Sequence, residues 1–168
     1  MRKKARFLAY GALIAALYVV LTYLQNFIFP DSASFAIQFR ASEALCVLAL
    51  FTPAAIPGLT VGCLLFNLSY AGALPLDFVV GTGATLAAAS AMWLLRRVTV
   101  KGFPLPALFM PAISNAFLVG WELDNYIGGG FWFNFVCVFI GEAVVLLTLG
   151  SLVYHIIRVR RLEQRLFG

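Results

Sequence analysis

The chain has 168 residues, of which 62% are hydrophobic and only 11% are charged. An average soluble domain is about 45–50% apolar and about 25% charged, so this composition excludes an ordinary soluble protein. It indicates an integral membrane protein, and the length allows one domain, residues 1–168. The formal net charge of +5 does not indicate nucleic-acid binding. The basic residues gather at the ends of apolar segments, where they fix topology and contact anionic lipid.

Six apolar segments follow one another along the chain. We expect helices at about 7–29, 41–52, 56–70, 76–95, 106–123 and 131–157. Crossing a bilayer takes about 20 apolar residues. The second and third segments are shorter than this, so we expect them to be tilted, kinked or partly re-entrant. The fold class predicted is an all-α membrane protein, a bundle of six transmembrane helices.

The charged residues predict which way the bundle faces. Lysines and arginines lie before the first segment, between the fourth and fifth, and after the sixth. With six crossings these three groups fall on one side, and the excess of positive charge marks that side as cytoplasmic. Both termini are therefore expected in the cytoplasm. Most acidic residues fall at the opposite ends of the helices, and Arg40 is the one basic residue there.

Three carboxylates, Glu43, Glu122 and Glu142, lie in or at the ends of apolar segments. A charged side chain at bilayer depth costs roughly 2.5–3.5 kcal/mol on insertion scales, so it normally faces the bundle interior and has a function. Other polar residues are expected near the same end of the bundle. The full predicted cluster is Gln38, Arg40, Ser42, Glu43, Asp77, Asn115, Glu122, Asn134 and Glu142.

Two interpretations of this polar cluster are open. One is an internal network, in which Arg40 pairs with Glu43 or Glu122. The other is a ligand site. The number of charges favours the ligand site, because one arginine does not neutralise three glutamates. Carboxylates only accept hydrogen bonds, so the ligand expected is rich in N–H groups or carries a cation.

Aromatic residues near the same end add a second expectation. A flat ring fits between such side chains, although the aromatic belt at a membrane interface has the same composition. The residues concerned are Trp121, Tyr126, Trp132 and Phe135.

Small residues recur at helical spacing in the first segment. They allow close approach of another helix, within the bundle or from a partner membrane protein. These residues are Ala5, Ala9, Ala12 and Ala16. A similar series in the fourth segment is interpreted as packing within the bundle: Gly81, Ala84, Ala88 and Ala91.

No catalytic pattern stands out in the sequence. It contains no phosphate-binding loop of the Gly-x-x-x-x-Gly-Lys-Ser/Thr type. No cluster has zinc-ligand spacing, and no nucleophile is paired with a base. We therefore expect a protein that is not an enzyme and that needs no cofactor or metal.

Several motifs follow one another along nearly the whole chain. The most specific is Gln-Phe-Arg-x-Ser-Glu within residues 37–45. The others are residues 12–22, 55–65 with Asn67, Val119-Gly-Trp-Glu122, Phe131-Trp-Phe-Asn134 and Gly141-Glu142. In this order they resemble the QueT family of queuosine-precursor transporters, which are substrate-binding S components of energy-coupling factor (ECF) transporters.

The resemblance implies a multi-pass subunit of a bacterial cell-membrane importer. Such a subunit binds its substrate outside and associates with a transmembrane coupling protein and two cytoplasmic ATPases. The family's Ala-x-x-x-Ala element falls on Ala12 and Ala16, the expected docking face. The implied substrate is a 7-deazaguanine such as prequeuosine, whose release follows toppling of the subunit in the membrane.

The chemistry of such a ligand matches the polar cluster. The N–H edge and the amine of the ligand would each donate to one carboxylate, supplied by two of Glu43, Glu122 and Glu142. Trp132 or Trp121 would stack on the ring. The ligand's carbonyl oxygen needs a donor, for which the candidates are Gln38, Arg40, Asn115 and Asn134.

An alternative from another class is a proton-coupled secondary transporter of a small nitrogenous base or cation. Glu142 would then carry the proton. Such proteins often show internal repeats, and none is visible here. A membrane enzyme acting on lipid is disfavoured by the lack of a catalytic constellation. A purely structural subunit is disfavoured because it has no use for three glutamates at the outer end of the bundle.

Overall fold

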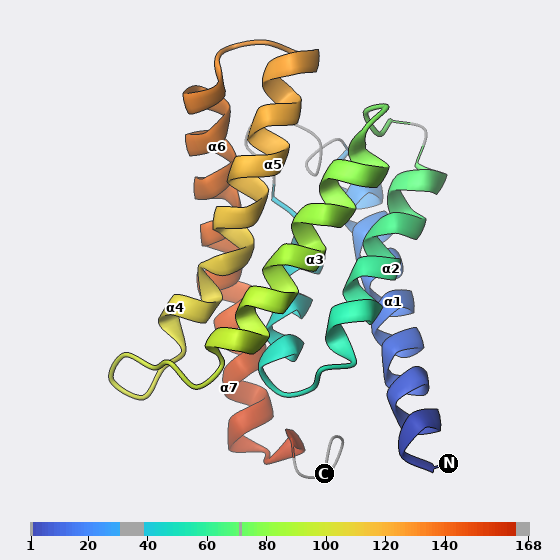
Figure 1. The fold of residues 1–168 in the computed structure, drawn as a ribbon, viewed down its shortest axis with the longest axis vertical. Coiled ribbons are helices and arrows are strands. Elements are labelled where there is room, and N and C mark those ends of the chain that lie inside the picture. Colours follow the sequence, from blue (N-terminus) through green and yellow to red (C-terminus); the bar gives the residue numbers. More distant parts are fainter. Residues whose placement is uncertain (1, 31–38, 71, 164–168) are drawn as a thin grey trace.

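The computed structural model describes residues 2–30, 39–70 and 72–163, and they are almost entirely helical (Figure 1). In chain order the elements are α1 (Arg2–Ile28), η1 (Ala41–Leu50), α2 (Ala55–Ser69), α3 (Asp77–Leu95), α4 (Leu105–Leu108), α5 (Met110–Tyr126), α6 (Phe131–Val145), η2 (Leu146–Gly150) and α7 (Ser151–Val159). Counting α4 with α5, and α6 with η2 and α7, gives the six predicted segments. Gln38 lies outside the described residues.

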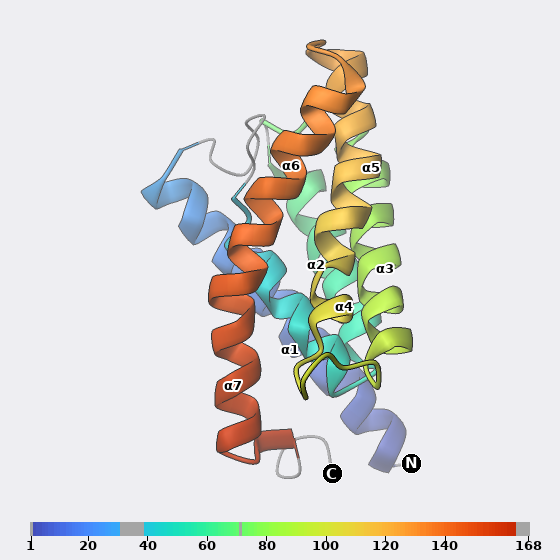
Figure 2. The ribbon, with the colours of Figure 1, turned by 90° about the vertical axis from the view of Figure 1, so that its left-hand side faces the viewer.

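Five helices follow one another around a central segment. Contacts join α1 to α2, α2 to α3, α3 to α5 and α5 to α6, and η1 touches α1, α2, α3, α6 and α7 from within. Figure 2 shows α1 running obliquely to the long column of α6 and α7. The start of α1 and the end of α7 lie at one end of the bundle (Figure 1). We call this the proximal end and the opposite one the distal end.

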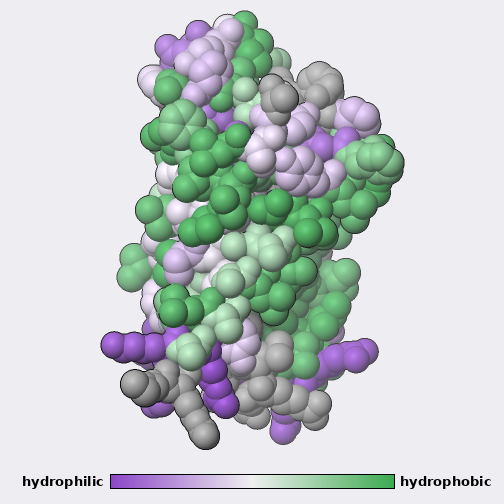
Figure 3. Space-filling model, turned by 90° about the vertical axis from the view of Figure 1, so that its right-hand side faces the viewer, coloured by the Kyte–Doolittle hydropathy of each residue, from purple (hydrophilic) through white to green (hydrophobic). Residues whose placement is uncertain are grey.

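The described residues include three helices that are long and apolar enough to cross a membrane: Lys3–Ile28, Asp77–Leu95 and Phe131–Val159. Figure 3 shows hydrophobic surface over the middle of the molecule and hydrophilic surface at both ends. The chain is thus a helical membrane protein. Six crossings with cytoplasmic termini stay a prediction, and the shared proximal position of both ends agrees with an even number of crossings.

The second segment adopts a conformation that its sequence did not reveal. Ala41–Leu50 forms a 3₁₀ helix of ten residues, whereas runs longer than three or four residues are uncommon. A 3₁₀ helix rises about 2.0 Å per residue and an α-helix about 1.5 Å. The segment therefore reaches about 5 Å further than an α-helix of the same length. At about 20 Å the segment is still shorter than the roughly 30 Å hydrocarbon core, so the 3₁₀ conformation offsets only part of the shortness noted in the sequence.

Glycines allow α1 and α2 to approach until their backbones touch. A Cβ atom added at Gly58 would lie 2.7 Å from the carbonyl oxygen of Gly11. One added at Gly62 would lie 2.8 Å from Cβ of Tyr18 and 2.9 Å from the carbonyl oxygen of Ala15. Only glycine fits at either position. This crossing fixes Tyr18 beside η1.

Candidate ligand-binding site

Polar side chains are buried in the distal half of the bundle. They come from η1 and its preceding residue, α2, α3, α5 and α6. The members are Arg40, Ser42, Glu43, Asn67, Asp77, Asn115, Glu122, Asn134 and Glu142. Glu43, Glu122 and Glu142 are each 0% exposed.

Glu43 is fully paired within the protein. The hydroxyl of Tyr18 donates to its Oε1 at 2.6 Å, and the thiol of Cys46 donates to its Oε2 at 3.0 Å. Tyr18 reaches it from α1, and Cys46 lies three residues further along η1. Both carboxylate oxygens are therefore occupied, and Glu43 joins η1 to α1.

Arg40 enters the site at the start of η1. Its guanidinium lies with Asn67 and Asp77 over Gly81: a Cβ added there would be 2.9 Å from Asn67 Nδ2, 3.8 Å from Arg40 Nη1 and 3.9 Å from Asp77 Oδ1. Asn67 Nδ2 also donates to the carbonyl oxygen of Asp77 at 2.7 Å. The absence of a side chain at Gly81 is what allows these polar groups to meet on α3.

Gln25, near the end of α1, holds the backbone on both sides of Arg40. Its Nε2 donates to the carbonyl oxygen of Phe39, and its Oε1 accepts from the backbone N–H of Ala41 at 2.6 Å. The side-chain amide of Gln25 thus donates to one backbone group and accepts from another, as a neighbouring β-strand would. These two hydrogen bonds hold the backbone of Arg40 in place.

Asn115 and Glu142 form a second pair, between α5 and α6. Asn115 Nδ2 donates to Glu142 Oε1 at 3.1 Å. Asn115 Oδ1 and Glu142 Oε2 are buried and have no hydrogen-bond partner among the described residues. Two acceptors on neighbouring helices are therefore left open side by side. One turn beyond Glu142 the helix widens into the π-helical η2, a feature frequent at functional sites.

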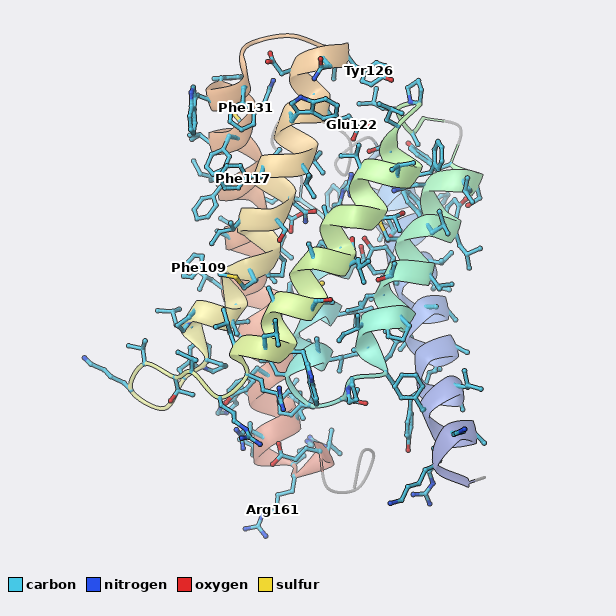
Figure 4. The ribbon with its side chains drawn as sticks, viewed as in Figure 1. Phe109, Phe117, Glu122, Tyr126, Phe131 and Arg161 are labelled. Carbon is cyan, nitrogen blue, oxygen red and sulfur yellow. The ribbon has the colours of Figure 1, made fainter. Side chains whose placement is uncertain are left out.

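Glu122 is the most incompletely paired carboxylate. Neither of its oxygens has a hydrogen-bond partner in the described part of the chain. The charged groups that act on it electrostatically are Asp77 and Arg40. Figure 4 shows Glu122 on the side of α5 that faces α3, while Phe117 points to the opposite side.

Two predicted site residues lie apart from these open acceptors. Trp132 is 70% exposed, and its ring packs edge-on against Phe131 and Phe135 at centroid distances of 5.0 and 5.9 Å. Asn134 is buried, but its Nδ2 donates to the carbonyl oxygen of Gly128 at 2.9 Å and secures the glycine turn between α5 and α6. The positions of both residues could be predicted from the sequence, whereas the directions of their side chains could not.

Sequence reasoning missed Tyr18, Gln25 and Cys46. A signal for the first two exists, because Tyr18, Thr22 and Gln25 recur at spacings of four and three and so line one face of an otherwise apolar helix. Cys46 follows Glu43 by three residues, which is one turn of a 3₁₀ helix. That relation becomes visible only when the helix type of η1 is known.

The unpaired groups limit what the cluster could bind. Glu122 has two unpaired oxygens, and Ser42, Asn115 and Glu142 have one each among the described residues. A carboxylate oxygen and an amide oxygen accept hydrogen bonds, and the hydroxyl of Ser42 can donate or accept. Nothing in the described residues forms a group of three or more His, Cys, Asp or Glu side chains able to hold a metal ion. A small molecule with several N–H donors would complement most of these unpaired groups.

These features define a helical membrane protein with a cluster of buried polar side chains, several of them unpaired among the described residues. The family model described as "QueT transporter" matches residues 8–159. The chain belongs to the QueT transporter family, as its motifs had indicated, and is a membrane transporter protein. No curated protein and no solved structure matched the chain.

Proposed function

We propose that the chain is the substrate-binding membrane subunit of an ECF-type importer in a bacterial cell membrane. It takes up a queuosine precursor, a 7-deazaguanine such as prequeuosine, from the outside. A transmembrane coupling protein and two cytoplasmic ATPases complete the transporter. The chain itself catalyses no reaction and holds no cofactor. The observation that supports this most is the set of buried acceptors without partners.

A 7-deazaguanine supplies what these acceptors lack. Its guanine-like edge carries adjacent N–H donors, and the aminomethyl group of prequeuosine is a cation with three more. Unpaired buried acceptors cost about 1–3 kcal/mol each, and more when charged. A ligand that pairs several of them at once therefore gains affinity, whereas an anionic ligand would meet uncompensated repulsion.

The outer face of α1 supports association with a coupling protein. Ala12 and Ala16 are exposed, although Ala84 and Ala88 in the similar series on α3 are buried. A hollow of about 260 Å³ lies beside Ala12. It is lined by Phe7, Leu8, Gly11, Ala12, Ala15, Pro57, Gly58 and Val61. Small residues that face lipid instead of neighbouring helices are typical of a surface that another helix covers.

The test is uptake of labelled prequeuosine by cells that express the chain with and without an ECF module. Uptake is expected only with the module and only when its ATPases are active. Ala12→Leu combined with Ala16→Leu should abolish uptake and co-purification of the module while leaving prequeuosine affinity unchanged. Ala87→Leu, at an exposed alanine on α3, is the matched control and should transport normally.

The rival mechanism is a proton-coupled transporter in which Glu142 carries the proton. The unpaired Oε2 of Glu142, deep in the bundle, is the observation in its favour. Purified chain in liposomes distinguishes the two. Prequeuosine accumulation driven by a pH gradient alone would support the rival and contradict the ECF mechanism, and no accumulation without the module would exclude the rival.

A further inference from the structure

We propose that the site has two subsites with different glutamates: Asn115 and Glu142 read the N–H edge of the base, and Glu122 with Asp77 receives the ligand's cation. Glu43 takes no part in either and holds η1 in place. This assignment rests on the proposed function and makes it more specific.

The edge subsite follows from the bond between Asn115 and Glu142. A carboxylate only accepts, so the amide of Asn115 must turn its Nδ2 toward Glu142 Oε1. This orientation leaves Asn115 Oδ1 open together with Glu142 Oε2. Two neighbouring acceptors match two neighbouring donors, and the edge of a guanine-like base carries an N–H beside an amino group.

The cation subsite follows from the charges around Glu122. Both of its oxygens are unpaired among the described residues, and Asp77 and Arg40 are the charged groups that act on it electrostatically. Asp77 also accepts the backbone N–H of Leu74 at 2.9 Å, so its position at the start of α3 is fixed. One guanidinium does not balance two carboxylates, and an ammonium group would provide three donors for the unpaired oxygens and the missing positive charge.

The spacing along α5 separates the two subsites. Asn115 and Glu122 are seven residues apart, so they share one face of the helix at an axial distance of about 10 Å. A ligand that reaches both needs donors at one end and a cation at the other. A 7-deazaguanine with an aminomethyl arm has this form, because its amino group and its arm lie on different rings.

Glu43 is assigned a structural role because each of its oxygens already accepts a hydrogen bond, from Tyr18 and from Cys46. Unlike Glu122 and Glu142, it leaves no oxygen without a partner that a ligand would have to supply. The three glutamates, equivalent in the sequence, therefore have three different roles.

The experiment compares two ligands that share the base edge but differ in charge. Prequeuosine carries the cationic aminomethyl group, and 7-cyano-7-deazaguanine carries a neutral nitrile in its place. Calorimetric titration of the purified chain with each ligand is repeated for Glu122→Gln and Glu142→Gln. Glu163→Gln, a matched change at the proximal end, serves as the control and should leave both affinities unchanged.

The wild type should bind prequeuosine more tightly than the nitrile. Glu122→Gln should weaken prequeuosine by about 10- to 100-fold, the range expected for a lost charged hydrogen bond, and change the nitrile by less than about threefold. Glu142→Gln should weaken both ligands by similar factors. If Glu122→Gln fails to fold, Asp77→Asn replaces it and should weaken mainly prequeuosine. If Glu142→Gln fails to fold, Asn115→Ala replaces it and should weaken both ligands by similar factors.

Equal weakening of both ligands by Glu122→Gln, or equal wild-type affinity for the two, would overturn the cation subsite. Loss restricted to prequeuosine in Glu142→Gln would overturn the edge subsite. A wild type that binds neither compound would instead contradict the proposed function itself. The two failures are therefore distinguishable in the same titrations.

Discussion

The distal half of the bundle contains two regions that share the same kind of residue and differ in how it is paired. Between α1 and η1, Glu43 is fully buried and both of its oxygens accept hydrogen bonds. Between α3, α5 and α6, Glu122 and Glu142 are equally buried, but three of their four oxygens have no partner among the described residues. Both oxygens of Glu43 are thus paired within the protein, whereas those of Glu122 and Glu142 are mostly unpaired.

The pairing of their oxygens distinguishes the three carboxylates, whereas their burial does not. Most buried polar groups in proteins are hydrogen-bonded, so a buried polar group without a partner requires an explanation. In the α1–η1 region the chain supplies the donors itself. In the α3–α5–α6 region the donors are missing, and a ligand with N–H groups is the simplest source.

The largest expected effect is on stability at Glu43. Glu43→Leu leaves the buried hydroxyl of Tyr18 and the thiol of Cys46 without an acceptor, which should lower the free energy of unfolding by about 2–4 kcal/mol. No donor in the described residues bonds to Glu122. Glu122→Leu therefore leaves no donor unpaired and should not destabilise the ligand-free protein. Thermal unfolding of both variants in the same detergent is the measurement.

Equal destabilisation by Glu43→Leu and Glu122→Leu would break the comparison, since it would mean that Glu122 is also paired in the folded protein. Tyr18→Phe provides a smaller, independent check, because it removes one donor from Glu43 and leaves the carboxylate in place.

The next effect concerns the rigidity of the α1 region. Gly62→Ala places a methyl group 2.8 Å from Cβ of Tyr18 and 2.9 Å from the carbonyl oxygen of Ala15, so α1 and α2 must separate. We expect a loss of about 1–3 kcal/mol, as for other overpacked sites. Gly83→Ala is the matched control, because a Cβ added there meets nothing within 4 Å. Unfolding temperatures that fall equally for both variants would contradict this account of the crossing.

The smallest effect is expected at Gln25, which links the two regions through Arg40. Gln25→Leu removes the bonds to Phe39 and Ala41 and should cost about 1–2 kcal/mol of stability. Gln25→Glu keeps the acceptor for Ala41 N–H and should cost less. Prequeuosine affinity should fall in the same order, because the start of η1 loses its fixed position. Affinity that is unchanged in Gln25→Leu would show that this contact does not support the site.

The number of helical segments and the polar composition of the site could be predicted from the sequence. Apolar runs are long and are ended by proline, glycine or charged residues, so their bounds were close to those observed. The helix type of η1 could not be predicted, because a 3₁₀ helix and an α-helix have the same composition. It depends on the distance that the segment must span inside the bundle.

The roles of individual site residues depend on direction, which periodicity defines poorly. Glu43, Glu122 and Glu142 look alike in the sequence, and only the positions of Tyr18, Cys46 and Asn115 distinguish them. Its place in the chain predicts that Trp132 stacks on a ligand. In the structure its side chain, at the start of α6, is 70% exposed. A one-residue change in helical phase would reverse such an assignment.

The central claim is that a ligand completes the open acceptors, and its most direct test is the unfolding temperature with and without saturating prequeuosine. Wild type should be stabilised by the ligand, as expected for binding to the folded state alone. Glu142→Gln should unfold at an equal or higher temperature without ligand, because glutamine keeps an acceptor for Asn115 Nδ2 and replaces the unpaired carboxylate oxygen with an amide group, and it should gain much less from prequeuosine. A variant that starts lower than wild type, or that gains as much from the ligand, would contradict the account.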